Sequence, residues 1–248
     1  MKKVHVYRER LRTLAEWDSF LLQESGLPGR RANLELARAV ADEGDEELFE
    51  RLLAFDAEKA PTNSPHEFLA FCGVLGLGKL LARGDREVLQ ELRRHASDAR
   101  WRIREAVAMA LQRLGEADME VLLQEMEQWS QGNLLEQRAA VAALCEPNQL
   151  REGRQIEKVL EILDRVTVSM QEVENRRTDE FKALRKGLGY CWSVAVAAYP
   201  EAGKKMMERW FVSDDRDVLW VMKENLRKKR LSRMDAEWVA AARLQLGM

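Results

Sequence analysis

The stretch 97–115 constrains the fold of this chain more than any other segment. Its apolar residues recur every three or four positions and form one stripe along a helix: Ile103, Ala106, Val107, Ala110, Leu111 and Leu114. We expect Ser97 or Asp98 to cap the start of this helix, because a short side-chain oxygen accepts a hydrogen bond from the free backbone N–H groups there. Gly115 is expected to end the helix in the left-handed conformation.

The rest of the chain repeats this pattern, and no segment shows the alternation of apolar and polar residues that is typical of a strand. Helix-start signals precede many of the apolar stripes, at Asn33, Asp45, Ser64-Pro65, Asp118 and Asn133. We expect about twelve or thirteen helices, the longer ones covering 4–24, 65–83, 153–173, 181–199, 202–212, 214–231 and 235–246. The polar, proline-containing stretch 56–65 is the one candidate linker.

The helices also resemble one another in pairs. Placing Arg104 over Arg138, an offset of 34 positions, superposes Ala106 on Ala140 and Val107 on Val141. Helix pairs that recur about every 35 to 45 residues are typical of an α-solenoid. We therefore predict an all-α fold, a right-handed solenoid (an α-α superhelix) of about six helix pairs that forms a single domain over 1–248.

The residues that carry this repeat are Asp98, the pair Ile103-Arg104 and the pair Ala110-Leu111. They resemble the HEAT-repeat, armadillo-like pattern, which has an Asp in the turn, an aliphatic–Arg pair and small residues on the inner helix. The resemblance is good over 85–145 and fair over 200–231. It implies that Asp98 and Arg104 take part in a ladder between neighbouring repeats, and so have a structural role.

Composition excludes several functional classes. Hydrophobic residues make up 46% and charged residues 33% of the chain, which is typical of a folded protein with a polar surface. The net charge of −2 argues against a surface that binds nucleic acid everywhere. The chain starts with no secretory signal and has no apolar run of about 18 residues, so we expect a cytoplasmic protein with no membrane partner.

No cofactor or metal site is expected from the distribution of ligand-type residues. The three cysteines, Cys72, Cys145 and Cys191, are far apart in apolar surroundings, which predicts buried, reduced thiols. The histidines are equally scattered, whereas a zinc site needs clustered ligands. Glycines interrupt an apolar helix at Gly73, Gly76 and Gly78, and we interpret them as points of close helix packing and not as a phosphate-binding loop.

The last helix pair carries the strongest candidate binding site. Steps of four, three, four and three residues place five side chains on one stripe of the predicted helix 214–231: Arg216, Trp220, Lys223, Arg227 and Arg230. Six Lys or Arg and one Glu occupy positions 223–233. Cations around an aromatic ring suit duplex or other nucleic acid, and equally an acidic protein. The alternative is a polar outer face of a terminal repeat, with Trp220 covered by Arg stems.

Trp101 and Arg102 form a second candidate pair, because Trp101 lies opposite the apolar stripe of its helix. If the inner helices line a concave face, Trp101 and Trp220 both face it. These seven residues are the predicted binding site, and no cluster of catalytic type is apparent.

A second resemblance keeps an enzymatic role open. The chain has Trp192-Ser193-Val194, Pro200, and Trp210 followed by Ser213-Asp214, which resembles part of the HEAT-like alkylpurine DNA glycosylases, the DNA alkylation repair enzymes. In that family the Trp-containing segment also carries the catalytic Asp, whereas 187–199 contains no Asp or Glu here. Two hypotheses follow: a non-catalytic binding or scaffold module for a protein or nucleic-acid partner, or a DNA-binding relative of these glycosylases, active or degenerate.

Overall fold

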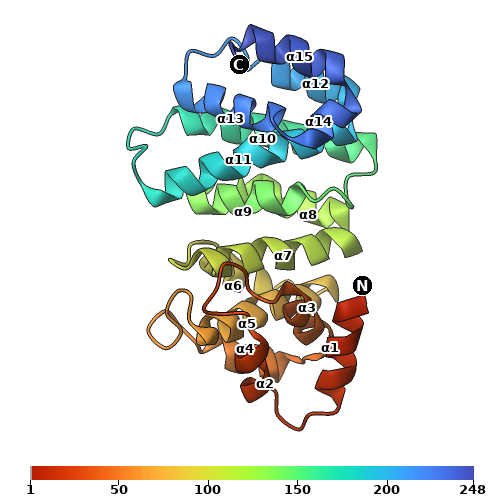
Figure 1. The fold of residues 1–248 in the computed structure, drawn as a ribbon, viewed down its shortest axis with the longest axis vertical. Coiled ribbons are helices and arrows are strands. Elements are labelled where there is room, and N and C mark those ends of the chain that lie inside the picture. The colour runs from red at the N-terminus through yellow and green to blue at the C-terminus, as the bar shows by residue number, and fades with distance from the viewer. Residues whose placement is uncertain (1) are drawn as a thin grey trace. The chain divides into compact units, whose positions relative to one another are not determined.

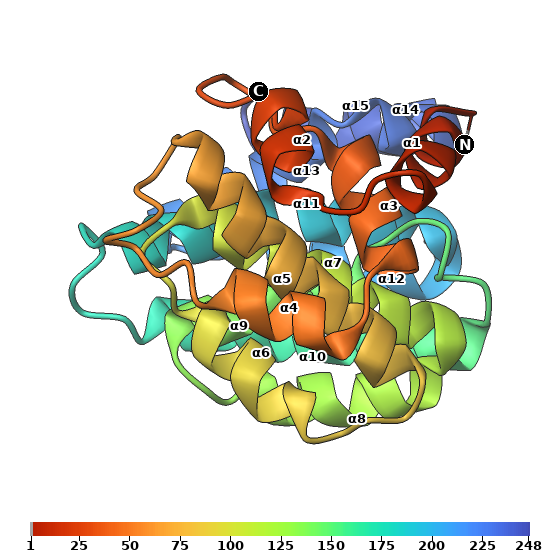
Figure 2. The ribbon, with the colours of Figure 1, turned by 90° about the horizontal axis from the view of Figure 1, so that it is seen from below.

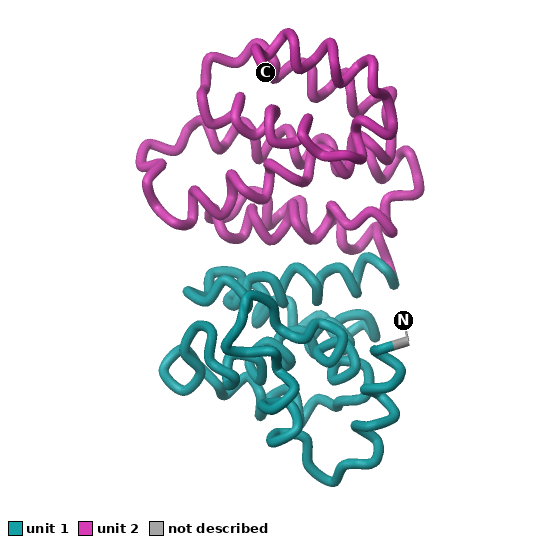
Figure 3. The backbone as a smooth tube through the Cα atoms, viewed as in Figure 1, with its two compact units in different colours: residues 1–117 teal, residues 118–248 magenta. Residues whose placement is uncertain are grey.

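The chain is built from helices alone in the computed structural model, which describes residues 2–248. Fifteen helices and no strand are found in this part of the chain (Figure 1), and the prediction of an all-α protein is confirmed. The helices form two compact units, residues 1–117 and residues 118–248 (Figure 3). The single domain over 1–248 and the right-handed solenoid stay predictions.

The first unit contains seven helices: α1 (Lys2–Arg12), α2 (Asp18–Glu24), α3 (Leu34–Glu43), α4 (Glu46–Leu53), α5 (Pro65–Ala82), α6 (Val88–Ala96) and α7 (Trp101–Ala117). Alternate helices pack against each other in succession, α1 on α3, α3 on α5 and α5 on α7. Helices α2 and α4 pack against α5, and α6 packs against both α5 and α7 (Figure 2). Helix α5 is thus surrounded, and most of its residues are buried.

Glycines allow the neighbours of α5 to approach it closely. A Cβ atom at Gly76 would lie 2.2 Å from the ring of Phe49 on α4, and one at Gly78 would lie 2.7 Å from Cα of Ala110 on α7. A Cβ at Gly73 would lie 3.0 Å from the backbone N of Leu53. The prediction that these glycines serve close helix packing is therefore confirmed.

The second unit contains eight helices: α8 (Met119–Trp129), α9 (Leu134–Leu144), α10 (Gly153–Gln171), α11 (Asp179–Ala198), α12 (Pro200–Glu208), α13 (Arg216–Leu226), α14 (Lys229–Met234) and α15 (Ala236–Gln245). Here too alternate helices follow one another, α9 on α11, α11 on α13 and α13 on α15. Helix α10 packs against α8, α11 and α12. Helix α11 contacts both neighbours in its row and so forms the centre of this unit.

Several helix starts lie where the caps predict them. The side chains of Asn33, Asp45, Ser64, Asp118 and Asn133 each accept a hydrogen bond from a backbone N–H in the first turn of the following helix. The apolar stripe of 97–115 is buried as predicted, with all six side chains at most 1% exposed. The three cysteines are also buried. No helix among the described residues is both long and apolar enough to cross a membrane.

The ends of α7 differ from the prediction. The Asp98 carboxylate accepts from the backbone N–H and the guanidinium of Arg100, so it stabilises a turn and does not cap the helix. Helix α7 begins at Trp101 and continues through Gly115, which is buried inside the helix, to Ala117. The predictions at Asp98 and Gly115 were wrong, because the Asp98 carboxylate is used within the turn to Arg100 and α7 continues for two residues beyond Gly115.

Two predicted helices are each divided in the structure. The stretch 4–24 breaks after Arg12, where the Trp17 indole N–H donates to the backbone oxygen of Leu11 and satisfies one carbonyl at the end of α1. The stretch 214–231 breaks between Leu226 and Lys229. The predicted linker 56–65 lies within the first unit.

Candidate functional site

Arg102, predicted to face a partner, is instead a buried side chain that is 3% exposed. Its guanidinium donates to Glu67 Oε2 at 3.1 Å, to the Gly29 backbone oxygen at 2.7 Å and to Asn63 Oδ1 at 3.2 Å. Glu67 is fully buried. Charges that are buried require such partners, because an unpaired ion in the interior is costly. These hydrogen bonds correct the predicted role of Arg102 in a binding groove. Arg102 connects the loops that contain Gly29 and Asn63 to the start of α7.

The neighbouring arginines act in the same way. Arg100 donates to the backbone oxygens of Phe55, Asp56 and Ala60 at 3.0 to 3.2 Å, and so holds the 56–65 loop. Arg104 donates to the backbone oxygens of Asp98 and Ala99. Trp101 is 45% exposed, with the Arg102 guanidinium carbon 4.5 Å from its ring centroid. Of this predicted cluster, Trp101 alone keeps a large exposed surface.

The predicted stripe of the second unit is only partly continuous. Arg216, Trp220 and Lys223 lie on α13 and Arg227 directly follows its last residue. Arg230 lies on α14, beyond the break, so its place on the same helical stripe is corrected. The stripe was predicted from one helical period, which no longer applies once the helix ends at Leu226.

Trp220 is half-buried against α11. A Cβ atom at Gly189 would lie 3.1 Å from its ring, and the Arg185 guanidinium carbon lies 4.4 Å from the ring centroid on a cation–π contact. Arg185 also forms an ion pair with Asp217. The arrangement matches the alternative interpretation in which arginine stems cover this ring.

Tyr190 was missed by the sequence reasoning and lies next to Arg230. It is 41% exposed, and Arg230 donates to its hydroxyl at 2.6 Å while the guanidinium carbon lies 4.5 Å from the ring centroid. Lys186 precedes Tyr190 by one helical turn and is also exposed. The i, i+4 spacing from a lysine to an exposed aromatic was the available signal.

We refer to seven exposed or half-exposed residues on α11, α13, α14 and the turn after α13 as the basic face. The cation–π contacts Arg185–Trp220 and Arg230–Tyr190 join these helices. The basic face consists of Lys186, Tyr190, Arg216, Trp220, Lys223, Arg227 and Arg230. From Arg216 to Arg243 the chain carries eight Lys or Arg and four Asp or Glu, although its net charge is −2. Positive charge is thus concentrated in this part of the second unit.

Asn225 fixes α13 against α11. It is fully buried, and its side-chain N–H groups donate to the backbone oxygens of Leu188 and Val221, both at 2.8 Å. Its side-chain oxygen accepts from the backbone N–H of Ser193 at 2.7 Å. All of the amide's strong hydrogen-bonding groups are used, which sets the register of the two helices that carry most of the basic face.

The turn before α13 is held by the carboxylates of Asp215 and Asp217, which both bind Arg176. Burial alone would raise the pKa of Asp215, but hydrogen bonds from the Arg176 guanidinium and from the backbone N–H groups of Val218 and Asp217 outweigh it and lower the pKa. Arg176 bonds both Asp215 and Asp217. Arg216 lies between these two aspartates in sequence and is exposed, with no ion pair to any described residue.

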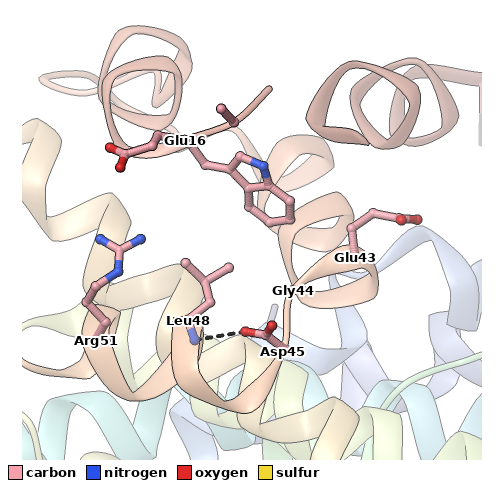
Figure 4. A pocket seen from close by; sticks show the side chains of 8 residues that line it. Glu16, Glu43, Gly44, Asp45, Leu48 and Arg51 are labelled. Carbon is pink, nitrogen blue, oxygen red and sulfur yellow. Dashed lines mark hydrogen bonds between the residues drawn. The ribbon is translucent and has the colours of Figure 1, made fainter. Parts of the chain in front are cut away.

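A separate pocket of about 460 Å³ lies in the first unit, where the α1–α2 loop faces the turn between α3 and α4 (Figure 4). Its charged groups mostly have partners: Glu43 binds Arg8 and Arg12, and Arg51 binds Asp18. Asp45 uses one oxygen to accept from the Leu48 backbone N–H. Glu16 lies on the same side of the pocket as Arg51 (Figure 4). These contacts hold α1 and α2 to α3 and α4.

The tryptophans that carry the resemblance to the DNA glycosylases have structural contacts. Trp192 is fully buried and donates to Thr167 Oγ1 at 3.1 Å. Trp210 is half-buried and donates to Asp164 Oδ1 at 2.9 Å. Within residues 2–248, no group of three or more His, Cys, Asp or Glu side chains is arranged to hold a metal ion. The chain matches no protein-family model, no characterised protein and no solved structure.

Proposed function

We propose that this protein is a non-catalytic binding module and that the basic face of its second unit binds an acidic segment of a protein partner. The observation that carries the proposal is a set of cations without ion pairs to described residues, Lys186, Arg216 and Lys223, on the same face as exposed Tyr190. Cations of this kind steer an anionic partner and weaken its binding to wrong ones. Tyrosine and arginine are also among the residues that contribute most at protein interfaces.

An acidic protein suits this face better than duplex DNA or RNA. Base stacking needs a free aromatic face, and one face of each ring of the basic face already carries a guanidinium, Arg185 over Trp220 and Arg230 over Tyr190. Carboxylates also lie among the cations, at Asp217 and Glu224. A continuous phosphate backbone would meet these charges repulsively, while a protein can place its own basic side chains against them.

The glycosylase hypothesis receives no comparable support. Such an enzyme uses a carboxylate to stabilise the positive charge that develops on the sugar, and the Trp192 segment contains none. Trp192 itself is buried in the second unit and donates to Thr167. We therefore propose no second function.

The proposal is tested with two labelled probes of equal formal charge, a glutamate-rich peptide and a short DNA duplex, by fluorescence anisotropy at several salt concentrations. We expect the peptide to bind more tightly than the duplex, with an affinity that falls as salt rises. The double variant Lys186→Glu/Arg216→Glu should weaken peptide binding about tenfold, equivalent to about 1.4 kcal/mol.

A charge-matched control separates the basic face from net charge. Arg154→Glu/Lys205→Glu reverses two exposed cations of α10 and α12 and should leave peptide affinity nearly unchanged. Equal losses for the two double variants, or tighter binding of the duplex than of the peptide, would overturn the proposal.

A further inference from the structure

Two of the three cysteines meet between α9 and α11 in the second unit. Cys145 is the residue that caps the C-terminal end of α9, and Cys191 lies within α11. Both side chains are buried, with 4% and 2% of their surface exposed. The two residues are far apart in the sequence, so their spacing gives no sign that they are neighbours.

Helices α9 and α11 run in the same direction at this point, which brings the two cysteines level with each other. A Cβ atom at Gly187 would lie 3.5 Å from Cγ of Arg138 and 3.7 Å from Cγ2 of Val141. One helical turn further along α11, the Cys191 thiol donates to the backbone oxygen of Val141 at 3.3 Å. One turn beyond Val141 at the end of α9 is Cys145, which therefore lies beside Cys191.

A shared acceptor holds both cysteines in this place. The Val141 backbone oxygen accepts from the backbone N–H of Cys145 at 3.1 Å as well as from the Cys191 thiol. The two cysteine side chains also lie within hydrogen-bonding distance of each other. Their sulfur atoms need to approach by no more than about 2 Å to reach the length of a disulfide bond. This movement is available at Cys145, because α9 ends there and residues 146–152 are not helical.

We infer that Cys145 and Cys191 form a redox-sensitive pair, which a disulfide oxidant such as oxidised glutathione converts into an internal disulfide that joins α9 to α11. Disulfides that form in reducing compartments are usually transient and redox-sensing. A link between two helices that already contact each other stabilises the fold, because it restricts the unfolded chain. The inference does not depend on the proposed function of the basic face.

The reaction transfers two electrons from the protein to the oxidant. Cys145 loses its proton to solvent, and its thiolate attacks one sulfur of oxidised glutathione, so that a glutathione thiolate leaves. Cys191 then loses its proton, and its thiolate attacks the Cys145 sulfur of this mixed disulfide, so that the second glutathione leaves. Both protein sulfurs are oxidised, and one oxidised glutathione becomes two reduced molecules that take up the two protons.

Burial controls the rate of this exchange and not its equilibrium. Burial, together with the contact to Cys191, raises the pKa of the Cys145 thiol, while the nearby Arg230 guanidinium opposes this shift. Because the thiolate is the attacking species, the exchange requires a local opening at the end of α9 or refolding of the chain. An equilibrium measurement is therefore the appropriate test.

The full chain is equilibrated with defined ratios of reduced and oxidised glutathione, both folded and in concentrated urea, starting from reduced and from oxidised protein. Free thiols are then blocked, and peptides with a Cys145–Cys191 link are quantified by mass spectrometry. We expect the equilibrium constant for the link to be at least about tenfold larger in the folded chain than in urea. A tenfold preference is about 1.4 kcal/mol, so the linked chain should melt about 3 °C or more above the reduced chain.

Cys72→Ser is the matched control, because Cys72 is also a buried thiol and the first unit contains no second cysteine. It should leave the link and its effect on melting unchanged, whereas Cys191→Ser should abolish both. The comparison of the folded chain with the chain in urea uses no variant, so it holds even if Cys191→Ser does not fold.

Three results would overturn the inference. The first is an equilibrium constant in the folded chain that is no larger than that in urea, which includes a reaction that stops at the mixed disulfide. The second is a linked chain that melts at or below the temperature of the reduced chain. The third is a folded chain in which Cys72 is linked as often as Cys145 and Cys191 are linked to each other.

Discussion

Replacing Arg102 by methionine separates a structural role of this arginine from a role in binding. The substitution removes three hydrogen bonds, to Glu67, Gly29 and Asn63. Glu67 is then left fully buried with the backbone N–H of Asn63, at 2.7 Å, as its remaining described hydrogen-bond partner. Removing one partner of a buried ion pair costs about 3–5 kcal/mol, because the other charge stays in the interior without compensation.

This cost is large enough to measure by urea unfolding, followed by circular dichroism at 222 nm. With a denaturant slope of about 1–3 kcal/mol per molar urea, the transition midpoint of the variant should fall by about 2 M. The double variant Arg102→Met/Glu67→Met should recover most of this loss, since it leaves no buried charge. Arg30→Met, which removes an exposed arginine, should change stability by less than about 0.5 kcal/mol.

One result would contradict a structural role for Arg102. If Arg102→Met unfolds at the same urea concentration as the unmodified chain but loses affinity for a binding partner, then the Glu67 contact does not stabilise the fold and Arg102 is a binding residue.

Three further predictions concern packing, thiols and pH. Gly78→Ala should cost about 1–3 kcal/mol, since its Cβ would lie 2.7 Å from the Ala110 Cα, whereas Gly187→Ala, with 3.5 Å of space, should stabilise by about 0.5–1 kcal/mol; equal thermal shifts would contradict this. The three buried cysteines, with the pKa values of Cys72 and Cys145 raised by burial, should react with a thiol reagent only after denaturation, and rapid native labelling would disprove it. Burial lowers the pKa of His95, and hydrogen bonds from Arg100 outweigh burial and lower that of Asp98. The unfolded chain therefore binds more protons, so the urea midpoint should fall on acidification, first below about pH 6.5 and further below about pH 4, and a midpoint that rises would refute the assignment.

Local signals in the sequence were sufficient to predict most of the helices and the buried stripe of α7. Apolar periodicity and capping residues act within one or two turns, so the buried stripe of α7 and the caps at Asn33 and Asp45 are readable without tertiary information. Glycines within a helical pattern likewise indicated the close contact that Gly78 makes with α7.

Contacts between residues that are far apart in the sequence could not be predicted from it. Glu67 and Arg102 are 35 positions apart, and nothing in the spacing of charges shows that one neutralises the other. The end of α13 carries no Gly or Pro, so no local signal predicts that this helix ends at Leu226 and that α14 begins at Lys229. A helical period does not show which charged side chains are buried. It therefore could not separate residues that stabilise the fold, such as Arg102, from residues on the surface.

The bonds from Arg100 have a consequence for how this region opens. Its guanidinium holds the carbonyls of Phe55, Asp56 and Ala60, so a loop without regular structure is fastened to the residue just before α7. Such a loop should open together with the start of that helix and not on its own. In hydrogen exchange, its slowest amides would then share one opening free energy with the first turn of α7, and the loop would behave as part of a single cooperative unit.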